Sequence, residues 1–226
     1  MEKLQKINIL YEDNHIIVVE KKPNILVQKD NTNDECLTDI IKKYLKIKYN
    51  KPGNVYLGLV HRLDRPVGGI MVFAKTSKAA NRLTKSIKNK EIKKIYYAVV
   101  TGHTNKKDKY IDYIKKNKKN NTSYITTKEE GKEAILEYET INYYKNLSLV
   151  KINLITGRSH QIRVQFSHHN HPLIGDKRYN LEEKKANTDI ALFAKTLEFN
   201  HPTTKEKLIF NLELPNRYPF NLFKNN

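Results

Sequence analysis

The carboxylate of Asp64 stands among positive side chains, directly before a bend rich in glycine. His61, Arg62 and Arg65 flank it, and Pro66 and two glycines follow. An acid in such a setting is expected to stay ionised at neutral pH, because nearby positive charge favours the charged form. The glycines let the backbone bend sharply and approach a ligand without a Cβ in the way. Such a carboxylate can serve as a covalent nucleophile, a general base or a metal ligand.

Metal binding is the weakest of these three uses. The spacing of His61 and Asp64 is common, and no second acidic cluster lies near them in the sequence to complete a two-metal nuclease site. His168, His169 and His171 are the other candidates, but the sequence places neither a cysteine nor a carboxylate beside them. We therefore favour a polar helix end over a zinc site there, and we expect no metal.

A second dense cluster covers residues 156–163. The chain has only seven arginines although lysine is its ordinary cation, and Arg62, Arg65, Arg158 and Arg163 fall inside the two clusters. Arginine is the residue suited to planar, bidentate contact with phosphate or carboxylate. Together the two clusters suggest an anionic substrate held against a carboxylate.

Arg163 is our candidate partner for Asp64. Ser159 can cap a helix that begins near His160, and Arg163 lies on that helix. A guanidinium hydrogen-bonded to a carboxylate favours its charged form. The alternative is an ordinary arginine on an amphipathic helix. Tyr96, in an otherwise apolar strand, is by itself more typical of a core aromatic than of a catalytic group.

The balance of charge points to a polyanionic partner. The formal net charge is +18 and the pI about 9.7, so RNA or DNA is the leading class of partner. The alternative is that many of the lysines are solvated surface residues that bind no partner. No stretch approaches the roughly 20 apolar residues that cross a bilayer, and the first residues lack a secretory signal. Cys36 is the only cysteine, so we expect a cytoplasmic protein without disulfides.

The apolar pattern predicts the elements that must position these clusters. Strands are expected at residues 7–11, 16–19, 55–60, 70–74, 95–100, twice within 134–155, and at 191–199 and 208–212; helices are expected at 36–49, after Thr76, and from about 160. Strands outnumber helices and lack βαβ regularity, which indicates an α+β domain with a mixed, mostly antiparallel sheet.

Two segments of the chain are less regular. Residues 106–132 carry nine lysines and few apolar residues within a Lys-rich insert or hairpin at 103–132, which we interpret as a mobile hairpin or loop. Two interpretations of this segment remain: an arm that contacts RNA, or a run of solvated surface charge. The tail at 220–226 is expected to fray.

Three segments, in this order, resemble the signatures of the RluA-type pseudouridine synthases. They are residues 61–64 (His-Arg-Leu-Asp), 94–98 (Lys-Ile-Tyr-Tyr-Ala) and 156–163 (Thr-Gly-Arg-Ser-His-Gln-Ile-Arg), and residues 10–13, 19–23 and 172–179 are also similar. The resemblance implies a single catalytic domain over residues 1–226 without an N-terminal accessory RNA-binding domain. It also implies a sheet split by a central basic cleft with flanking helices. One departure is Val67 and Gly68, where many members have Thr and Ser.

The resemblance implies an isomerase that converts uridine in RNA to pseudouridine without cofactor or metal. The base is detached from C1′, turned, and rejoined through C5. Asp64 would be the essential carboxylate, attacking the sugar or the ring or stabilising a glycal-type intermediate. Tyr96 would stack on the uracil and assist removal of the C5 proton, and Arg163 would pair with Asp64. Arg62 would fill the gap left by the flipped nucleotide, since a stacked, paired base hides both reacting carbons.

The expected substrate is a uridine in a loop or single-stranded part of ribosomal or transfer RNA. Arg62, His61, Arg65, Arg158 and His160 are the expected RNA-binding residues, with lysines on phosphates. We expect a monomer. A non-catalytic RNA-binding protein with the same fold is the main alternative, and a metal-dependent nuclease, which a chelator would inactivate, is the second.

Overall fold

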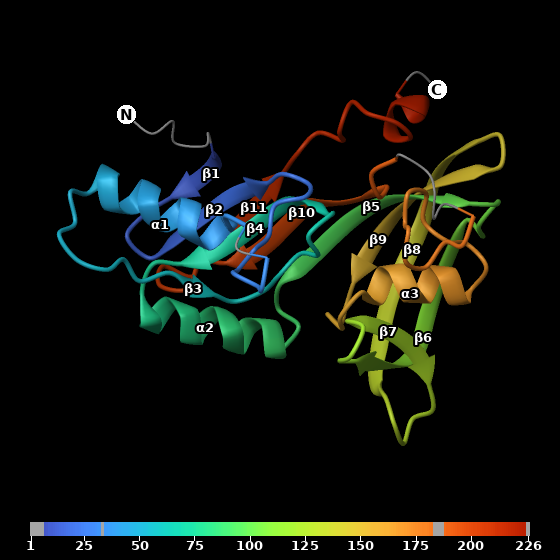
Figure 1. The fold of residues 1–226 in the computed structure, drawn as a ribbon, viewed down its shortest axis with the longest axis horizontal. Helices are drawn as coiled ribbons and strands as arrows, with labels where there is room; N and C mark the ends of the chain where they lie inside the picture. Colours follow the sequence, from blue (N-terminus) through green and yellow to red (C-terminus); the bar gives the residue numbers. More distant parts are fainter. Residues whose placement is uncertain (1–6, 33, 183–187, 225–226) are drawn as a thin grey trace. The chain divides into compact units, whose positions relative to one another are not determined.

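The computed structural model describes residues 7–32, 34–182 and 188–224. By its internal contacts the chain divides into two compact units. The first unit is formed by residues 1–92 and 197–212, and the second by residues 93–196 and 213–226 (Figure 1). Asp64 belongs to the first unit, whereas Tyr96 and Arg163 belong to the second. Each unit is described by itself.

The first unit contains a small antiparallel sheet with two helices. Its strands are β1 (Asn8–Glu12), β2 (Ile16–Lys21), β3 (Gly58–Leu59) and β4 (Gly68–Ala74), and its helices are α1 (Leu37–Lys48) and α2 (Ser77–Lys88). β2 lies between β1 and β4, β3 also pairs with β4, and all three pairings are antiparallel. β11 (Lys207–Asn211) pairs with β10 (Leu192–Asn200). The chain leading into β4 carries Asp64.

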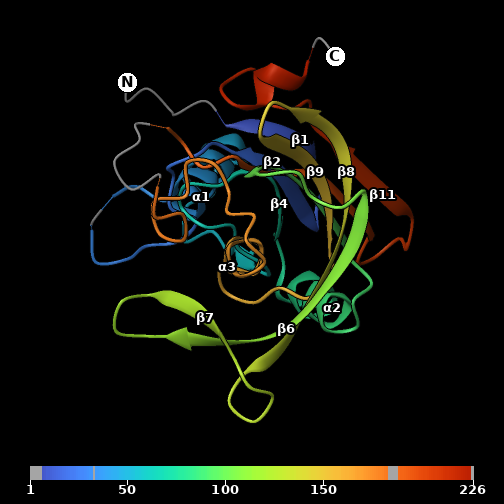
Figure 2. The ribbon, with the colours of Figure 1, turned by 90° about the vertical axis from the view of Figure 1, so that its right-hand side faces the viewer.

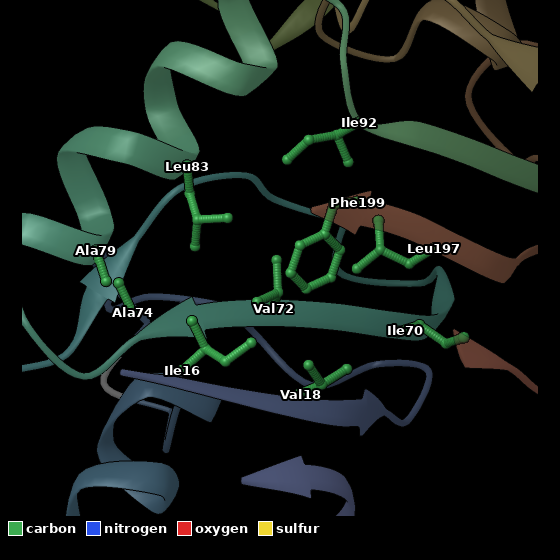
Figure 3. Packing of buried hydrophobic residues seen from close by; sticks show 10 residues of the cluster. All are labelled: Ile16, Val18, Ile70, Val72, Ala74, Ala79, Leu83, Ile92, Leu197 and Phe199. Carbon is green, nitrogen blue, oxygen red and sulfur yellow. The ribbon is translucent and has the colours of Figure 1, made fainter. Parts of the chain in front are cut away.

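Helix α2 packs on this sheet through one apolar stripe. Ala79 and Leu83 are buried against side chains of β2 and β4, among them Val18 and Val72 (Figure 3). Every residue of β4 is buried, as its unbroken apolar sequence predicts for a strand covered on both faces. Thr76 caps α2, because its hydroxyl accepts the Ala79 N–H at 3.1 Å. The strand that follows the Asp64 loop is therefore firmly anchored.

The second unit is a longer antiparallel sheet with one α-helix. Its elements are β5 (Lys93–Thr101), β6 (Lys107–Asn117), β7 (Thr122–Thr126), β8 (Lys132–Tyr144), β9 (Leu147–Leu154), α3 (Gln161–His168) and the 3₁₀ turn η1 (Phe220–Phe223). The strand order is β5-β9-β8-β6-β7, and each of these pairings is antiparallel. α3 packs against β6 and β7, which form a hairpin (Figure 2).

Most expected elements are present, and the α+β class with mostly antiparallel pairing is confirmed. The Lys-rich segment is more regular than its composition suggests, because β6 pairs with β8 from Lys107 to Ile114 and buries Tyr110 and Ile114. The tail was expected to fray, and this was wrong for its first part: Phe220 and Phe223 are buried, and Phe223 contacts Tyr144. Residues 225–226 of that tail lie outside the described part. The basic cleft concerns both units together and stays a prediction.

None of the helices in the described ranges has the length and apolar character that crossing a membrane requires.

Glu12 joins three parts of the first unit at the end of β1. Its carboxylate accepts hydrogen bonds from Lys48 at 2.7 Å, Lys75 at 2.8 Å, and the hydroxyls of Tyr49 at 2.6 Å and Tyr44 at 2.9 Å. Burial alone would raise the pKa of this carboxyl, but the hydrogen bonds from the two lysines and two tyrosines hold it at about 2. α1 is thereby tied to β1 and to the residue after β4.

We predict that Glu12→Gln lowers the free energy of unfolding at pH 7 by about 1–3 kcal/mol, because two ammonium groups lose a charged acceptor. The folded pKa of about 2 lies below the ordinary 4.5. The stabilisation is thus complete above pH 4.5 and is lost as pH falls towards 2. Urea unfolding between pH 7 and 2 should show wild type and variant converging in acid. Glu35→Gln, which removes an exposed pair with Lys43, is the control and should change little. A gap of equal size at pH 7 and pH 2.5 would contradict this role.

Candidate active site

The Asp64 loop is a tight turn that leads directly into β4. The Val67 N–H donates to the Asp64 carbonyl at 3.0 Å, which closes the turn over Arg65 and Pro66. Leu63 is buried, whereas the side chain of Asp64 is half-buried. A carboxylate in this position is held by its backbone and still partly reaches the surface of the unit.

Lys21, at the end of β2, lies beneath this turn. Its side chain is fully buried, and its ammonium group donates to the carbonyls of Arg65 at 2.9 Å and Lys22 at 3.0 Å. Burial lowers the pKa of Lys21 to about 7, while the negative charge of Asp64 opposes the shift and the positive charge of Arg65 adds to it. Lys21 therefore anchors the loop and, in its protonated form, also interacts with the carboxylate of Asp64.

The two positions after the turn require glycine for different reasons. A Cβ on Gly68 would lie 3.0 Å from Cδ of Pro23 and 3.3 Å from the carbonyl oxygen of Lys21, closer than side chains normally approach. Gly69 has a φ of +129°, which disfavours any residue with a side chain. Glycine at residue 68 thus lets the segment around Pro23 pack directly against the loop.

The basic residues beside Asp64 differ in exposure. His61 is anchored, because its Nε2 accepts the Val72 N–H of β4 at 3.1 Å. Arg65 forms an exposed ion pair with Asp34 at 2.6 Å. Arg62 is exposed. These positions place cationic side chains at the surface beside the loop.

Arg163 forms a buried, bidentate ion pair with Asp176 in the second unit. Its Nε and Nη2 donate to the two carboxylate oxygens of Asp176 at 2.8 and 2.7 Å, and both side chains are buried. Oδ1 of Asp176 also accepts the backbone N–H groups of Arg178 and Tyr179. Gly175 makes the bend possible, since it has a φ of +74° and a Cβ there would collide with backbone. The guanidinium is fixed by a bidentate, charge-assisted pair.

Tyr179 connects this pair to the start of α3. The guanidinium carbon of Arg163 lies 5.1 Å from the centre of the Tyr179 ring. The Tyr179 hydroxyl is hydrogen-bonded to Nδ1 of His160 at 2.7 Å and accepts the Ser123 N–H of β7 at 2.7 Å. Burial raises the pKa of this hydroxyl, so it stays protonated. Nε of Arg158 donates to the Glu133 carbonyl at 2.8 Å. His160 and Arg163 are thus held by side chains, and Arg158 by backbone.

The expected capping of α3 by Ser159 was wrong. The helix begins at Gln161, its N-cap is His160 in a left-handed conformation with a φ of +55°, and no side chain caps it from that position. Instead, Oε1 of Gln161 accepts the Arg158 N–H at 3.0 Å and the Thr156 hydroxyl at 2.8 Å. The first side chain of the helix reaches back to the turn, so a cap from Ser159 is not needed.

Tyr96 lies in the middle of β5, opposite Ile152 of β9. Its ring is almost completely buried, with 7% of the residue exposed. The structure therefore brings Arg158, His160 and Arg163 together on one turn and helix of the second unit and places Tyr96 in that unit's sheet. His61, Arg62 and Arg65 surround Asp64 in the first unit.

Comparison with known proteins identifies the chain. The sequence profile of the family described as RNA pseudouridylate synthase matches residues 15–168. The chain belongs to this family. A protein of Blochmanniella floridana named ribosomal large subunit pseudouridine synthase D is 32% identical to it over 92% of this chain and 70% of that one. A synthase C of Buchnera aphidicola (subsp. Schizaphis graminum) is 33% identical over 89% and 65%, respectively.

The fold agrees with the family. The structure titled Human RNA Pseudouridylate Synthase Domain Containing 4 superposes with a TM-score of 0.77, at 21% identity, over 92% of this chain and 88% of that one. Human RNA Pseudouridylate Synthase Domain Containing 1 gives a TM-score of 0.76 at 22% identity over 96% and 87%. Pseudouridine synthases isomerise uridine in RNA to pseudouridine without a cofactor. The matched residues include Asp64 and Arg163.

The sequence analysis assigned no role to three residues that hold the Asp64 loop or Arg163. They are Lys21, Asp176 and Tyr179. All three lie in stretches of the sequence that resemble the family. The signal for Asp176 was the preceding Gly175, which marks a bend with a positive φ. Lys21 had no local signal, because a buried lysine cannot be told from its exposed neighbour Lys22 by sequence.

We predict that Asp176→Asn lowers the free energy of unfolding by about 3–5 kcal/mol, because it leaves the buried charge of Arg163 without its carboxylate. Chemical denaturation measures this change. Asp34→Asn removes the exposed partner of Arg65 and should cost less than about 1 kcal/mol. Equal effects of the two substitutions would show that the buried pair contributes no more to the free energy of unfolding than the exposed pair does.

Proposed function

We propose that this chain isomerises a uridine in ribosomal or transfer RNA, with Asp64 as its essential carboxylate. The observation that carries the assignment is the Asp64 loop: a half-buried carboxylate interacts with the buried ammonium of Lys21 within a chain of net charge +18. A protein that only binds phosphate has no use for an acid in a cationic setting. A family that breaks and remakes a glycosidic bond without a cofactor does.

Asp64 attacks the sugar or the uracil ring, or stabilises a glycal-type intermediate, while the C1′–N1 bond breaks and C1′ rejoins C5. Tyr96 stacks on the uracil and assists removal of the C5 proton. Arg163 pairs with Asp64 in addition to Asp176, which is compatible with the five N–H donors of a guanidinium. Its rigid pairing with Asp176 supports this role, because a positioned cation favours the charged nucleophile without reorganising.

The RNA is held by phosphate and stacking contacts around the extruded nucleotide. We assign Arg62 to the gap left by the flipped base and His61, Arg65, Arg158 and His160 to contacts with RNA. Arg62 is exposed beside the loop, in keeping with this role. The target uridine lies in a loop or single strand, where flipping costs least.

The relatives' names favour ribosomal RNA over transfer RNA as substrate. We further propose that both units form one catalytic domain, which acts as a monomer in the cytoplasm. Incubation of the purified protein with ribosomal RNA and with transfer RNA, each transcribed without modifications, followed by chemical mapping of pseudouridine, tests the assignment. New pseudouridine at a defined position is expected in one of them. Tight RNA binding without any pseudouridine would make the protein a binder rather than an enzyme.

We predict that Asp64→Asn lowers the single-turnover rate by at least about a hundredfold while the Kd for RNA stays within about threefold of wild type, because the amide retains the shape but not the charge. Rapid quenching and filter binding measure the two quantities. Asp108→Asn, an exposed substitution on β6, is the matched control and should leave both unchanged. Turnover of Asp64→Asn near the wild-type rate would refute the assignment.

A further inference from the structure

Two histidines at the end of α3 meet a carboxylate from β6. The side chains of Asp112, His168 and His169 each offer one ligand atom, and these three atoms lie within 4.8 Å of one another. All three residues belong to the second unit. From the sequence, the histidines lacked an adjacent carboxylate and a zinc site was disfavoured. The fold supplies that carboxylate from a strand more than fifty residues away.

Two of the three ligands are already oriented. Nε2 of His169 lies 3.2 Å from Oδ2 of Asp112, and the His169 ring stacks on Tyr110 with a centroid distance of 3.8 Å and an interplanar angle of 5°. Nε2 of Gln165 donates to the same Oδ2 at 2.7 Å and to the Ala134 carbonyl at 3.2 Å. Hydrogen bonds that orient a ligating carboxylate are typical of metal sites.

The spacing suits zinc. Zinc binds imidazole nitrogen and carboxylate oxygen at about 2.0–2.2 Å in a tetrahedral arrangement, so neighbouring ligand atoms stand roughly 3.4 Å apart. The separation of 3.2 Å between His169 and Asp112 matches this value. His168 is exposed, and its ligand atom lies within 4.8 Å of those of Asp112 and His169. Two imidazoles and one carboxylate leave a fourth position for water.

Gln165 gives an independent indication that a hydrogen-bond donor is missing beside Asp112. Its side chain is fully buried, and within the described ranges its Oε1 has no hydrogen-bond partner. A buried amide oxygen without a donor costs free energy. The same side chain holds Asp112 through its nitrogen, so the deficient oxygen belongs to the residue that orients a candidate ligand. A water bound to a metal is an O–H donor of the kind that is missing.

We propose that Asp112, His168 and His169 bind a zinc ion that ties the end of α3 to β6. This site has no part in the isomerisation and does not depend on the proposed function. The metal would stabilise the packing of α3, the helix that carries Arg163, against the hairpin of β6 and β7. An ion pair between His169 and Asp112 without metal is the competing account.

The test is titration of zinc chloride into the full chain, freed of metal with chelator and carrying no histidine tag. Calorimetry should give one zinc per chain. Cobalt should bind in its place and show the visible absorption of a tetrahedral complex, which zinc abolishes. Loss of an orienting contact alone weakens metal sites about 10–100-fold, so His169→Gln, Asp112→Asn and His168→Ala should each weaken binding at least tenfold. Zinc should raise the Tm of wild type by more than that of these three variants.

His103→Ala, an exposed histidine elsewhere in the same unit, is the control and should bind zinc as wild type does. Absence of saturable binding, or binding that survives all three ligand substitutions, would overturn the proposal in favour of the ion pair. Equal loss in His103→Ala would overturn it too, because it would indicate scattered surface binding. If the Asp112 variant fails to fold, the exposed His168→Ala decides.

Discussion

A buried ammonium group holds the loop on which this synthase depends. Lys21 is removed from water at the end of β2, and hydrogen bonds from its ammonium group together with the negative charge of Asp64 offset part of the cost of that burial. Two of its acceptors are main-chain carbonyls, one of them on the residue after Asp64. The contact therefore fixes the path of the backbone as well as a side chain. The negative charge of Asp64 favours the protonated form of Lys21.

In the second unit a buried charged group again fixes a functional part of the site, but there the buried group is an anion and the functional side chain is a cation. Here a buried carboxylate, Asp176, fixes the cation of Arg163 through two short hydrogen bonds, and backbone N–H groups complete its shell. Arg163 and Asp176 are both buried, and in such surroundings a fixed charge interacts strongly and needs no rearrangement during a reaction. In each unit a buried charged group thus holds the functional side chain or the loop that carries it.

Local pattern predicted the elements well and their polar contacts poorly. The unbroken apolar run of β4 and the stripe of α2 follow from burial, which period and composition express directly. The pairing of β6 with β8 was hidden because charged residues on the exposed face dominate its composition. The cap of α3 was missed because Gln161 reaches back to Thr156, and tail residues such as Phe220 were expected to fray although they pack on the sheet.

The motifs around Asp64 and Arg163 were recognisable because residue types and spacing carry them. Their partners were not, since a contact such as that of Lys21 with the Arg65 carbonyl spans 44 residues. Sequence also cannot distinguish a buried lysine from the exposed Lys22 beside it. The carboxylate that faces His169 escaped notice for the same reason: only the folded sheet brings Asp112 to it.

The most direct test of this account compares Lys21→Met with Lys22→Met, two neighbouring lysines of which only the first is buried. Single-turnover formation of pseudouridine at saturating RNA is the measurement, with circular dichroism to confirm folding. The account predicts that Lys21→Met folds and binds RNA but reacts about a hundredfold more slowly, because misplacing a reacting group by about 1 Å has an effect of that size. Lys22→Met should react at the wild-type rate. A folded Lys21→Met that turns over as fast as wild type would contradict the claim that this buried cation positions Asp64.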